Sequence, residues 1–111
     1  VDMYIVMFEF VVKPGKTEAF LAAWPKVTQG IYLFKGSLGS RLHKSDEGKW
    51  IAYAQWPSKQ VYEQAASISM SEDYEAQRAA MHDALNLEDT KTLYQMDVEV
   101  DYLQRRPFAV A

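Results

Sequence analysis

One strand of a predicted β-hairpin carries apolar side chains on both of its faces, and this feature limits the possible folds more than any other. The hairpin covers residues 36–58, with its turn at Asp46-Glu47-Gly48. Side chains alternate across a strand, so one face of the segment 49–56 carries Trp50, Ala52, Ala54 and Trp56, and the other carries Ile51, Tyr53 and Gln55. Both faces need cover, and the helices of the chain suffice for one. We therefore expect a homodimer with a pocket between its two sheets.

The residues before the hairpin predict a strand followed by a helix. The strand covers residues 3–12 and is largely apolar on both faces. A turn at residues 13–16 leads into the helix, with Thr17 as its N-cap. Pro25 should kink or split this helix, which ends at Lys35-Gly36.

The residues after the hairpin predict two helices and a last strand. Pro57 ends the sheet ladder, and Ser58 is a suitable N-cap for a helix that runs to about residue 66. A second helix is expected over residues 72–85. Residues 90–103 then alternate between apolar and polar side chains, which is typical of a long amphipathic strand.

The resulting order, β-α-β-β-α-β, is typical of a ferredoxin-like α+β domain with an antiparallel sheet. Its usual topology places the first and third strands at the centre, and these are the two strands with apolar residues on both faces. A second sheet from an identical subunit would cover the free face and form a dimeric α+β barrel. We expect a single domain over residues 1–111, with a core at about 3–103 and a short C-terminal tail at 104–111.

Composition excludes several classes of function. Cysteine is absent, which rules out disulfides, thiolate metal sites and cysteine nucleophiles. A net charge of −3 does not provide the excess of positive charge that is typical of nucleic-acid-binding domains. No apolar run approaches the roughly 20 residues that span a bilayer, and Met3 leads directly into strand sequence, so no signal peptide is expected. We predict a cytoplasmic protein with no nucleic-acid or membrane partner.

The chain also resembles a known family. The segments KPGKTEAFLAAW, GSLGSRLHKSDEGKWIAYAQWPSKQVYEQA and the late VDYL are similar to antibiotic biosynthesis monooxygenase (ABM) domains, over about residues 3–103. The most specific part is the strand end Ala54-Gln55-Trp56-Pro57-Ser58. The resemblance implies a dimeric α+β barrel, a pocket in each subunit, no cofactor, and oxygenation of electron-rich aromatic compounds by molecular oxygen. The family also includes haem-degrading enzymes, isomerase-like members and proteins without known activity.

The haem-degrading branch of the family fits this chain poorly. Its pattern has an asparagine in the first strand, a tryptophan at the end of the third strand and a histidine ligand in the later helix. Trp56 matches the tryptophan, but Phe8 or Glu9 stands at the asparagine position and Gln77 or Arg78 at the histidine position. We therefore do not expect haem degradation.

Aromatic residues supply a flat apolar surface that suits a small aromatic ligand. The predicted substrate-binding set contains Phe8, Trp24, Tyr53 and Trp56. Trp56 also matches the pocket position of the family and is a candidate catalytic residue. Each of these residues can instead belong to the core or to the dimer interface.

Two polar residues on the first strand of the hairpin suit oxygenation without a cofactor. His43 can act as the base, and Arg41 on the same face can bind the resulting oxyanion of the substrate. Alternatively, both are solvated charges on an edge strand. His82 flanks an apolar helix edge and is expected to be solvated. With only two histidines, no metal site is expected.

The leading hypothesis is a cofactor-independent monooxygenase of the ABM type that acts on a small aromatic, phenolic or quinol-like compound. Two alternatives stay open, a dimer that binds a small ligand without chemistry and an isomerase on the same scaffold.

Overall fold

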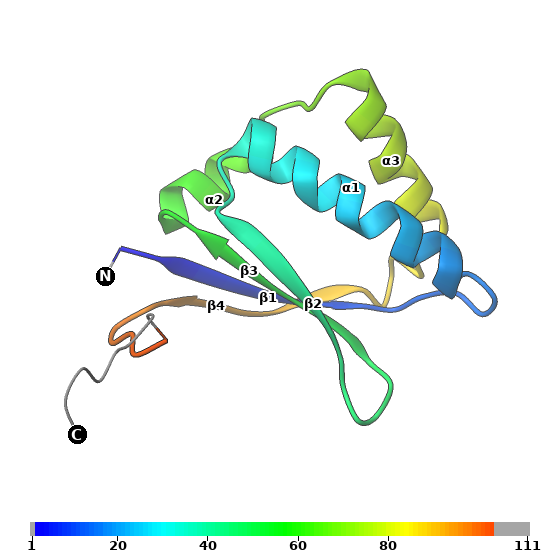
Figure 1. The fold of residues 1–111 in the computed structure, drawn as a ribbon, viewed down its shortest axis with the longest axis horizontal. Coiled ribbons are helices and arrows are strands. Elements are labelled where there is room, and N and C mark those ends of the chain that lie inside the picture. Colours follow the sequence, from blue (N-terminus) through cyan, green and yellow to red (C-terminus); the bar gives the residue numbers. More distant parts are fainter. Residues whose placement is uncertain (1, 104–111) are drawn as a thin grey trace.

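The computed structural model describes residues 2–103, and the predicted tail at 104–111 lies outside them. The elements are β1 (Tyr4–Phe10), α1 (Thr17–Lys35), β2 (Gly39–Lys44), β3 (Trp50–Trp56), α2 (Lys59–Ala65), α3 (Glu72–Asp83) and β4 (Lys91–Asp97). The strands form one antiparallel sheet in the order β2-β3-β1-β4, which confirms the ferredoxin-like α+β fold with β1 and β3 at the centre (Figure 1). Within the described range, no helix has the length and apolar character needed to cross a membrane.

The hairpin and the helix after it form as predicted. β2 and β3 pair from Gly39 opposite Gln55 to Lys44 opposite Trp50. Ser58 caps α2, because its Oγ accepts a hydrogen bond from the Val61 N–H at 3.1 Å. This cap fixes the sharp change of direction at the end of β3 and places α2 beside the last residues of that strand (Figure 1).

Helix α1 differs from the prediction at two positions. Thr17 is the first helical residue, and Lys16 occupies the cap position without a side-chain hydrogen bond. The helix also continues through Pro25 and is not split there. Proline removes one backbone hydrogen bond, while Phe20 and Val27 are buried on either side of it and hold both halves of the helix to the core.

The first and last strands are shorter than predicted. β1 ends at Phe10, two residues before the predicted end. β4 ends at Asp97, which pairs with Tyr4, so the prediction of a strand to residue 103 is wrong. Beyond this pair, one hydrogen bond from the Val98 N–H to the Met3 carbonyl (2.9 Å) closes the ladder. β1 begins at Tyr4 and offers no further strand for pairing.

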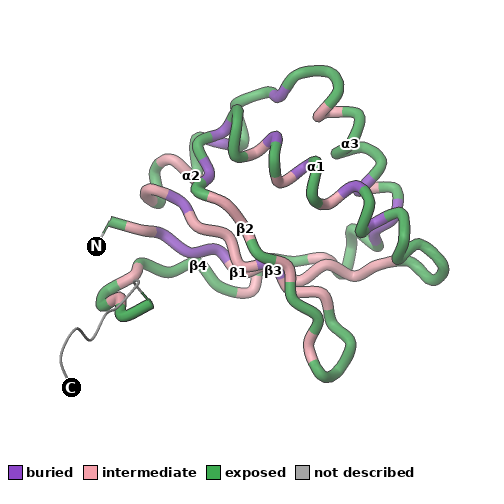
Figure 2. The backbone as a smooth tube through the Cα atoms, in the orientation of Figure 1, coloured by how far each residue is buried: buried purple, intermediate pink, exposed green. Residues whose placement is uncertain are grey.

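The helices cover only one face of the sheet, which we call the inner face (Figures 1 and 2). Two buried clusters lie on this side, one around Phe20 of α1 and one around Tyr4, Val6 and Trp56. The opposite, outer face carries the alternate residues of the strands, Ile5, Met7, Ile51, Tyr53, Tyr94 and Met96. Tyr94 is 62% exposed and Met96 is 40% exposed, so part of this apolar face is uncovered in the single chain.

Candidate functional site

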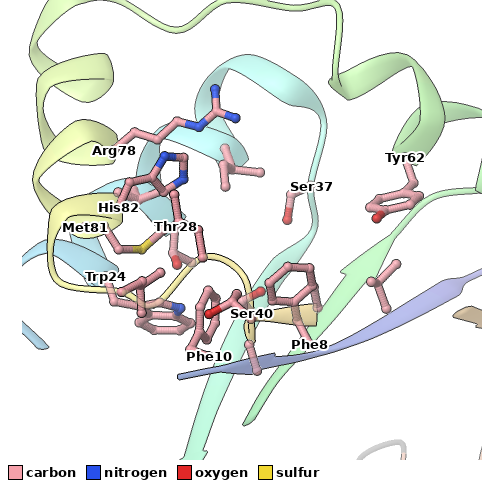
Figure 3. A pocket seen from close by; sticks show the side chains of 18 of the residues that line it. Phe8, Phe10, Trp24, Thr28, Ser37, Ser40, Tyr62, Arg78, Met81 and His82 are labelled. Atoms are coloured by element: carbon pink, nitrogen blue, oxygen red, sulfur yellow. The ribbon is translucent and has the colours of Figure 1, made fainter. Parts of the chain in front are cut away.

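A cavity of about 430 Å³ lies between the inner face of the sheet and the helices α1 and α3 (Figure 3). This volume is within the range of small-molecule sites, and the lining is mostly apolar, as such sites usually are. The sheet contributes Phe8, Phe10 and Trp56 to the lining, and the helices contribute Trp24, Arg78 and His82.

The cavity follows from the order of side chains along the inner face of β3. That face carries Trp50, Ala52, Ala54 and Trp56. Trp50 packs against Phe20 with 5.9 Å between ring centroids, and Trp56 packs against Tyr62 at 5.3 Å, so large rings fill both ends of the row. The two alanines between them carry only methyl groups and leave the middle of the layer unfilled.

Aromatic rings form the wall on the sheet side of the cavity. Phe8 and Phe10 point from β1 with their ring centroids 5.1 Å apart, and Trp24 from α1 lies next to Phe10 (Figure 3). Phe10 also contacts the buried ring of Phe20 at 5.3 Å, which fixes this wall to the core. A flat aromatic molecule can stack on or against such rings at little conformational cost.

Trp56 carries an unusual polar atom. Its side chain is 5% exposed and its ring meets Tyr62 edge-on, yet its Nε1 is buried without a hydrogen-bond acceptor among the described residues. An unpaired buried donor costs about 1–3 kcal/mol, and most native indole N–H groups find a partner. Trp56 therefore lines the cavity with its ring, while its N–H is buried in the surrounding packing.

Two ionisable side chains of α3, Arg78 and His82, lie across the cavity from the phenylalanines (Figure 3). They are four residues apart and so share one side of the helix. Burial, and after it the Arg78 cation, lower the pKa of His82 below its usual value. Both effects favour the neutral form of the imidazole.

The remaining contacts of Arg78 are weak. Among residues 2–103, its nearest carboxylate oxygen belongs to Glu75, 3.9 Å away, and both side chains are partly exposed. Exposed pairs of this kind contribute little to stability. The guanidinium therefore keeps most of its hydrogen-bonding capacity for a bound molecule.

The structure divides the predicted site residues between the two faces of the sheet. Phe8, Trp24 and Trp56 line the cavity. Tyr53 lies on the outer face, with Arg41 directly opposite it on β2. His43 lies two residues further along the same face, where its Nδ1 is 3.1 Å from the carbonyl oxygen of Ile51. These last three side chains are therefore separated from the cavity by the sheet itself.

Sequence reasoning missed the polar side of the cavity. It predicted a solvated ring for His82, whereas the structure shows a half-buried ring that lines the cavity. The available signal was the helical spacing of Arg78 and His82 next to the buried Met81. That spacing shows that the polar pair borders the apolar edge of α3, but it does not show that an open space lies in front of it.

The fold and the cavity together define a ferredoxin-like α+β domain with an aromatic-lined internal space. Residues 3–83 match the family described as antibiotic biosynthesis monooxygenase. The chain belongs to this family, as the resemblance of its sequence predicts.

Solved structures with the same fold share few residues with this chain. SnoaB, a cofactor-independent oxygenase from Streptomyces nogalater, is 12% identical over 94% of this chain and 100% of its own, with a TM-score of 0.67. Rv0793 from Mycobacterium tuberculosis is 16% identical over 92% and 99% of the two chains, with a TM-score of 0.65. A Bordetella bronchiseptica protein with the same family name is 16% identical over 90% and 100%, with a TM-score of 0.72. No curated protein matches the chain.

Proposed function

We propose that the chain is a cofactor-independent monooxygenase that acts on a small aromatic, phenolic or quinol-like compound. The observation that carries this proposal is the aromatic-lined cavity of about 430 Å³ in a member of the ABM family. SnoaB, which shares the fold, is named a cofactor-independent oxygenase. This activity is the one that best suits a small apolar cavity with few polar groups.

In this proposal the side chains of the cavity bind and orient the substrate. Phe8 and Trp24 contact its aromatic ring, and the ring of Trp56 closes one end of the cavity. An apolar cavity also accepts dioxygen, which is small and uncharged. The electrons come from the substrate, so its ring must be electron-rich.

The reaction can be written for α-naphthol as a model substrate. Dioxygen places one oxygen atom on the ring carbon para to the hydroxyl group and releases the other as water. The substrate loses four electrons and becomes naphthoquinone, and dioxygen gains four electrons. No other reductant is needed for this balance.

The test is substrate-dependent oxygen uptake by the purified full chain. We expect uptake with α-naphthol or a related quinol, and one labelled oxygen atom in the product when labelled dioxygen is supplied. Trp24→Leu should lower kcat/KM at least about tenfold, because it removes an aromatic wall of the cavity. Tyr32→Leu is the matched control, since Tyr32 is on the same helix, is 55% exposed and does not line the cavity.

The outcomes separate an enzyme from a binding protein. Uptake that is equal in the wild type and in Trp24→Leu would contradict the proposed site. Ligand-dependent thermal stabilisation without oxygen uptake would favour a dimer that binds a ligand without chemistry. Loss of substrate without uptake would favour an isomerase.

We also propose that the protein is a homodimer that pairs through the outer face of the sheet. All three helices of the described residues cover the inner face, and the outer face keeps Tyr94 and Met96 exposed. Burying apolar side chains of this size is favourable by about 1.5–3 kcal/mol for each residue. Tyr53 and Arg41, predicted from the sequence to bind substrate, and His43, predicted as the base, lie on the outer face as well, and the site proposed here does not include them.

A further inference from the structure

We propose that His82 is the proton acceptor of the cavity and that Arg78 stabilises the oxyanion formed there. The cavity would then select aromatic compounds with an ionisable hydroxyl group, such as phenols and enols. This inference rests on the proposed function in one respect only, namely that an aromatic compound binds in the cavity.

The placement of the two side chains is the first argument. Arg78 and His82 are one helical turn apart on α3, and both line the cavity opposite the rings of Phe8 and Phe10 (Figure 3). A planar ligand that contacts the phenylalanines therefore presents its edge to the imidazole and the guanidinium. A hydroxyl group on that edge can lie within hydrogen-bond reach of both side chains.

The charges around His82 are the second argument. On its own helix these are Arg78 and Glu75, and Lys35 at the end of α1 lies close enough to Arg78 for the two cations to interact. On its other side, His82 borders a surface hollow together with Lys13, Asp83 and Glu88. Burial and the Arg78 cation both disfavour the protonated ring, which leaves His82 neutral in the empty site.

A bound hydroxyl group changes this balance in a defined way. The O–H bond of the ligand breaks, its proton forms a bond to a ring nitrogen of His82, and the electron pair stays on the ligand oxygen. The oxyanion then lies between the imidazolium and the guanidinium, so each cation is paired with a negative charge. In the empty site, an imidazolium beside Arg78 has no negative charge to pair with, and the oxyanion of the bound ligand provides one.

An electron-rich ring is the chemical consequence of this proton transfer. A phenolate or enolate donates electrons to dioxygen more readily than the neutral phenol or enol does. His82 would thus prepare the ligand for oxidation without taking part in electron transfer. The requirement for an acidic hydroxyl group also separates substrates from their methyl ethers.

The sequence itself supplies the competing hypothesis for comparison. His43 and Arg41 form a similar histidine-arginine pair on the outer face of the sheet, away from the cavity. The four substitutions His82→Gln, Arg78→Gln, His43→Gln and Arg41→Gln therefore decide which pair meets the ligand. His82→Asn serves as a second variant where His82→Gln does not fold, as judged by circular dichroism.

The experiment uses para-nitrophenol as the probe, because its phenolate absorbs visible light and its neutral form does not. Para-nitroanisole, the methyl ether, is the matched probe that cannot ionise. Binding of each probe to the full-length protein is measured by tryptophan fluorescence. Visible absorbance then gives the ionised fraction of bound para-nitrophenol, and a pH indicator gives the protons released for each molecule bound.

In the wild type we expect bound para-nitrophenol to ionise at a lower pH than the free compound, by about one pH unit or more, which is a tenfold preference for the phenolate. Arg78→Gln should remove this shift. In His82→Gln, either the hydroxyl proton of para-nitrophenol should be released to solvent on binding, or the bound probe should stay neutral. The two outer-face variants should behave as the wild type does.

The contradicting results are equally specific. Para-nitrophenol that binds but ionises as it does in water would overturn the inference and leave the ligand cavity standing. The inference would also be overturned if His82→Gln retained the ionised fraction and the proton count of the wild type, or if His43→Gln had the larger effect on them. Failure of both probes to bind at millimolar concentration would overturn the proposed function and this inference together.

Discussion

Phe8 lies directly opposite Ala52 in the ladder between β1 and β3, so a large aromatic side chain of one central strand faces one of the smallest side chains of the other. Val6 and Ala54 form the next pair on the same face. The helices above rest on the larger residues at both ends of this face, and the cavity is the volume that the two alanines leave open.

Filling this volume should remove ligand binding with little effect on stability. In Ala54→Leu, the added side chain enters an existing cavity, so the cost of overpacking is avoided and the free energy of unfolding should change by less than about 1.5 kcal/mol. Binding of para-nitroanisole, followed by tryptophan fluorescence, should weaken at least about tenfold. Ala22→Leu on the exposed side of α1 is the matched control. Unchanged binding by Ala54→Leu would place the ligand elsewhere.

The stability of the protein should depend on the ring of Trp56 and much less on its N–H group. Trp56→Phe removes packing volume but also removes a buried N–H without a partner, so we expect the free energy of unfolding to change by less than about 1 kcal/mol. Trp56→Ala should lower it by about 3–5 kcal/mol. Urea denaturation measures both values. A loss in Trp56→Phe as large as that in Trp56→Ala would mean that the N–H has a partner, such as an ordered water.

The core and the topology could be predicted because they depend on local patterns. Two strands with apolar residues on both faces, the cap at Ser58 and the turn at Gly48 determine the order and pairing of the elements. The length of β4 could not be predicted, because its alternating pattern continues to residue 103 while the partner strand β1 begins at Tyr4. Strand ends depend on the neighbouring strand as well as on the strand's own residues.

The candidate site could be predicted only in its sheet residues. Alternation places Phe8 and Trp56 on one face of the sheet and Tyr53 and Arg41 on the other, and reasoning from residue type alone grouped all four. Their separation follows from the register of the strands. The polar side of the cavity needed tertiary information, because the rotation of α3 about its axis decides whether His82 faces solvent or the cavity.

Gly30 of α1 permits the close approach of the first turn of α3 and of Met70 just before it. A Cβ atom at this position would lie 2.7 Å from the Met70 sulfur and 2.8 Å from the Tyr74 ring, and both distances are too short. Tyr74 is held in turn by an edge-on contact with Phe34, 5.6 Å between centroids. Helix propensity favours alanine over glycine by about 0.5–1 kcal/mol. The clash should nevertheless prevail, and Gly30→Ala should lower the free energy of unfolding by about 1 kcal/mol or more.

The prediction is tested by measuring the free energy of unfolding of Gly30→Ala and of Gln29→Ala by urea denaturation. Gln29 is the exposed neighbour of Gly30 on the same helix, so its substitution changes propensity without a clash. A gain in stability for Gly30→Ala would show that α1 and α3 can move apart without cost.

His82 should make stability depend on pH in a known direction. Its pKa is lowered in the folded protein, by burial first and then by Arg78, so the unfolded chain binds more protons in the window below its ordinary value of 6.5. The contribution of His82 is therefore fully present above about pH 6.5 and is lost as the pH falls through this window. Urea denaturation at a series of pH values should show a smaller loss for His82→Gln than for the wild type. His43→Gln is the comparison, because both variants lack one histidine. An equal pH dependence in the wild type and in His82→Gln would mean that the ring is solvated.

The exposed apolar residues on the outer face of the sheet predict that the protein is a dimer in solution. Light scattering behind a sizing column should show a dimer that persists on dilution to micromolar concentration. Tyr94→Lys should convert it to a monomer, because a two-fold axis brings the same face of both subunits together and places two lysines in one apolar interface. Tyr32→Lys is the matched control, since Tyr32 is 55% exposed on the helix side of the sheet, against 62% for Tyr94. A monomeric wild type, or equal dissociation by both variants, would show that the outer face is covered in another way.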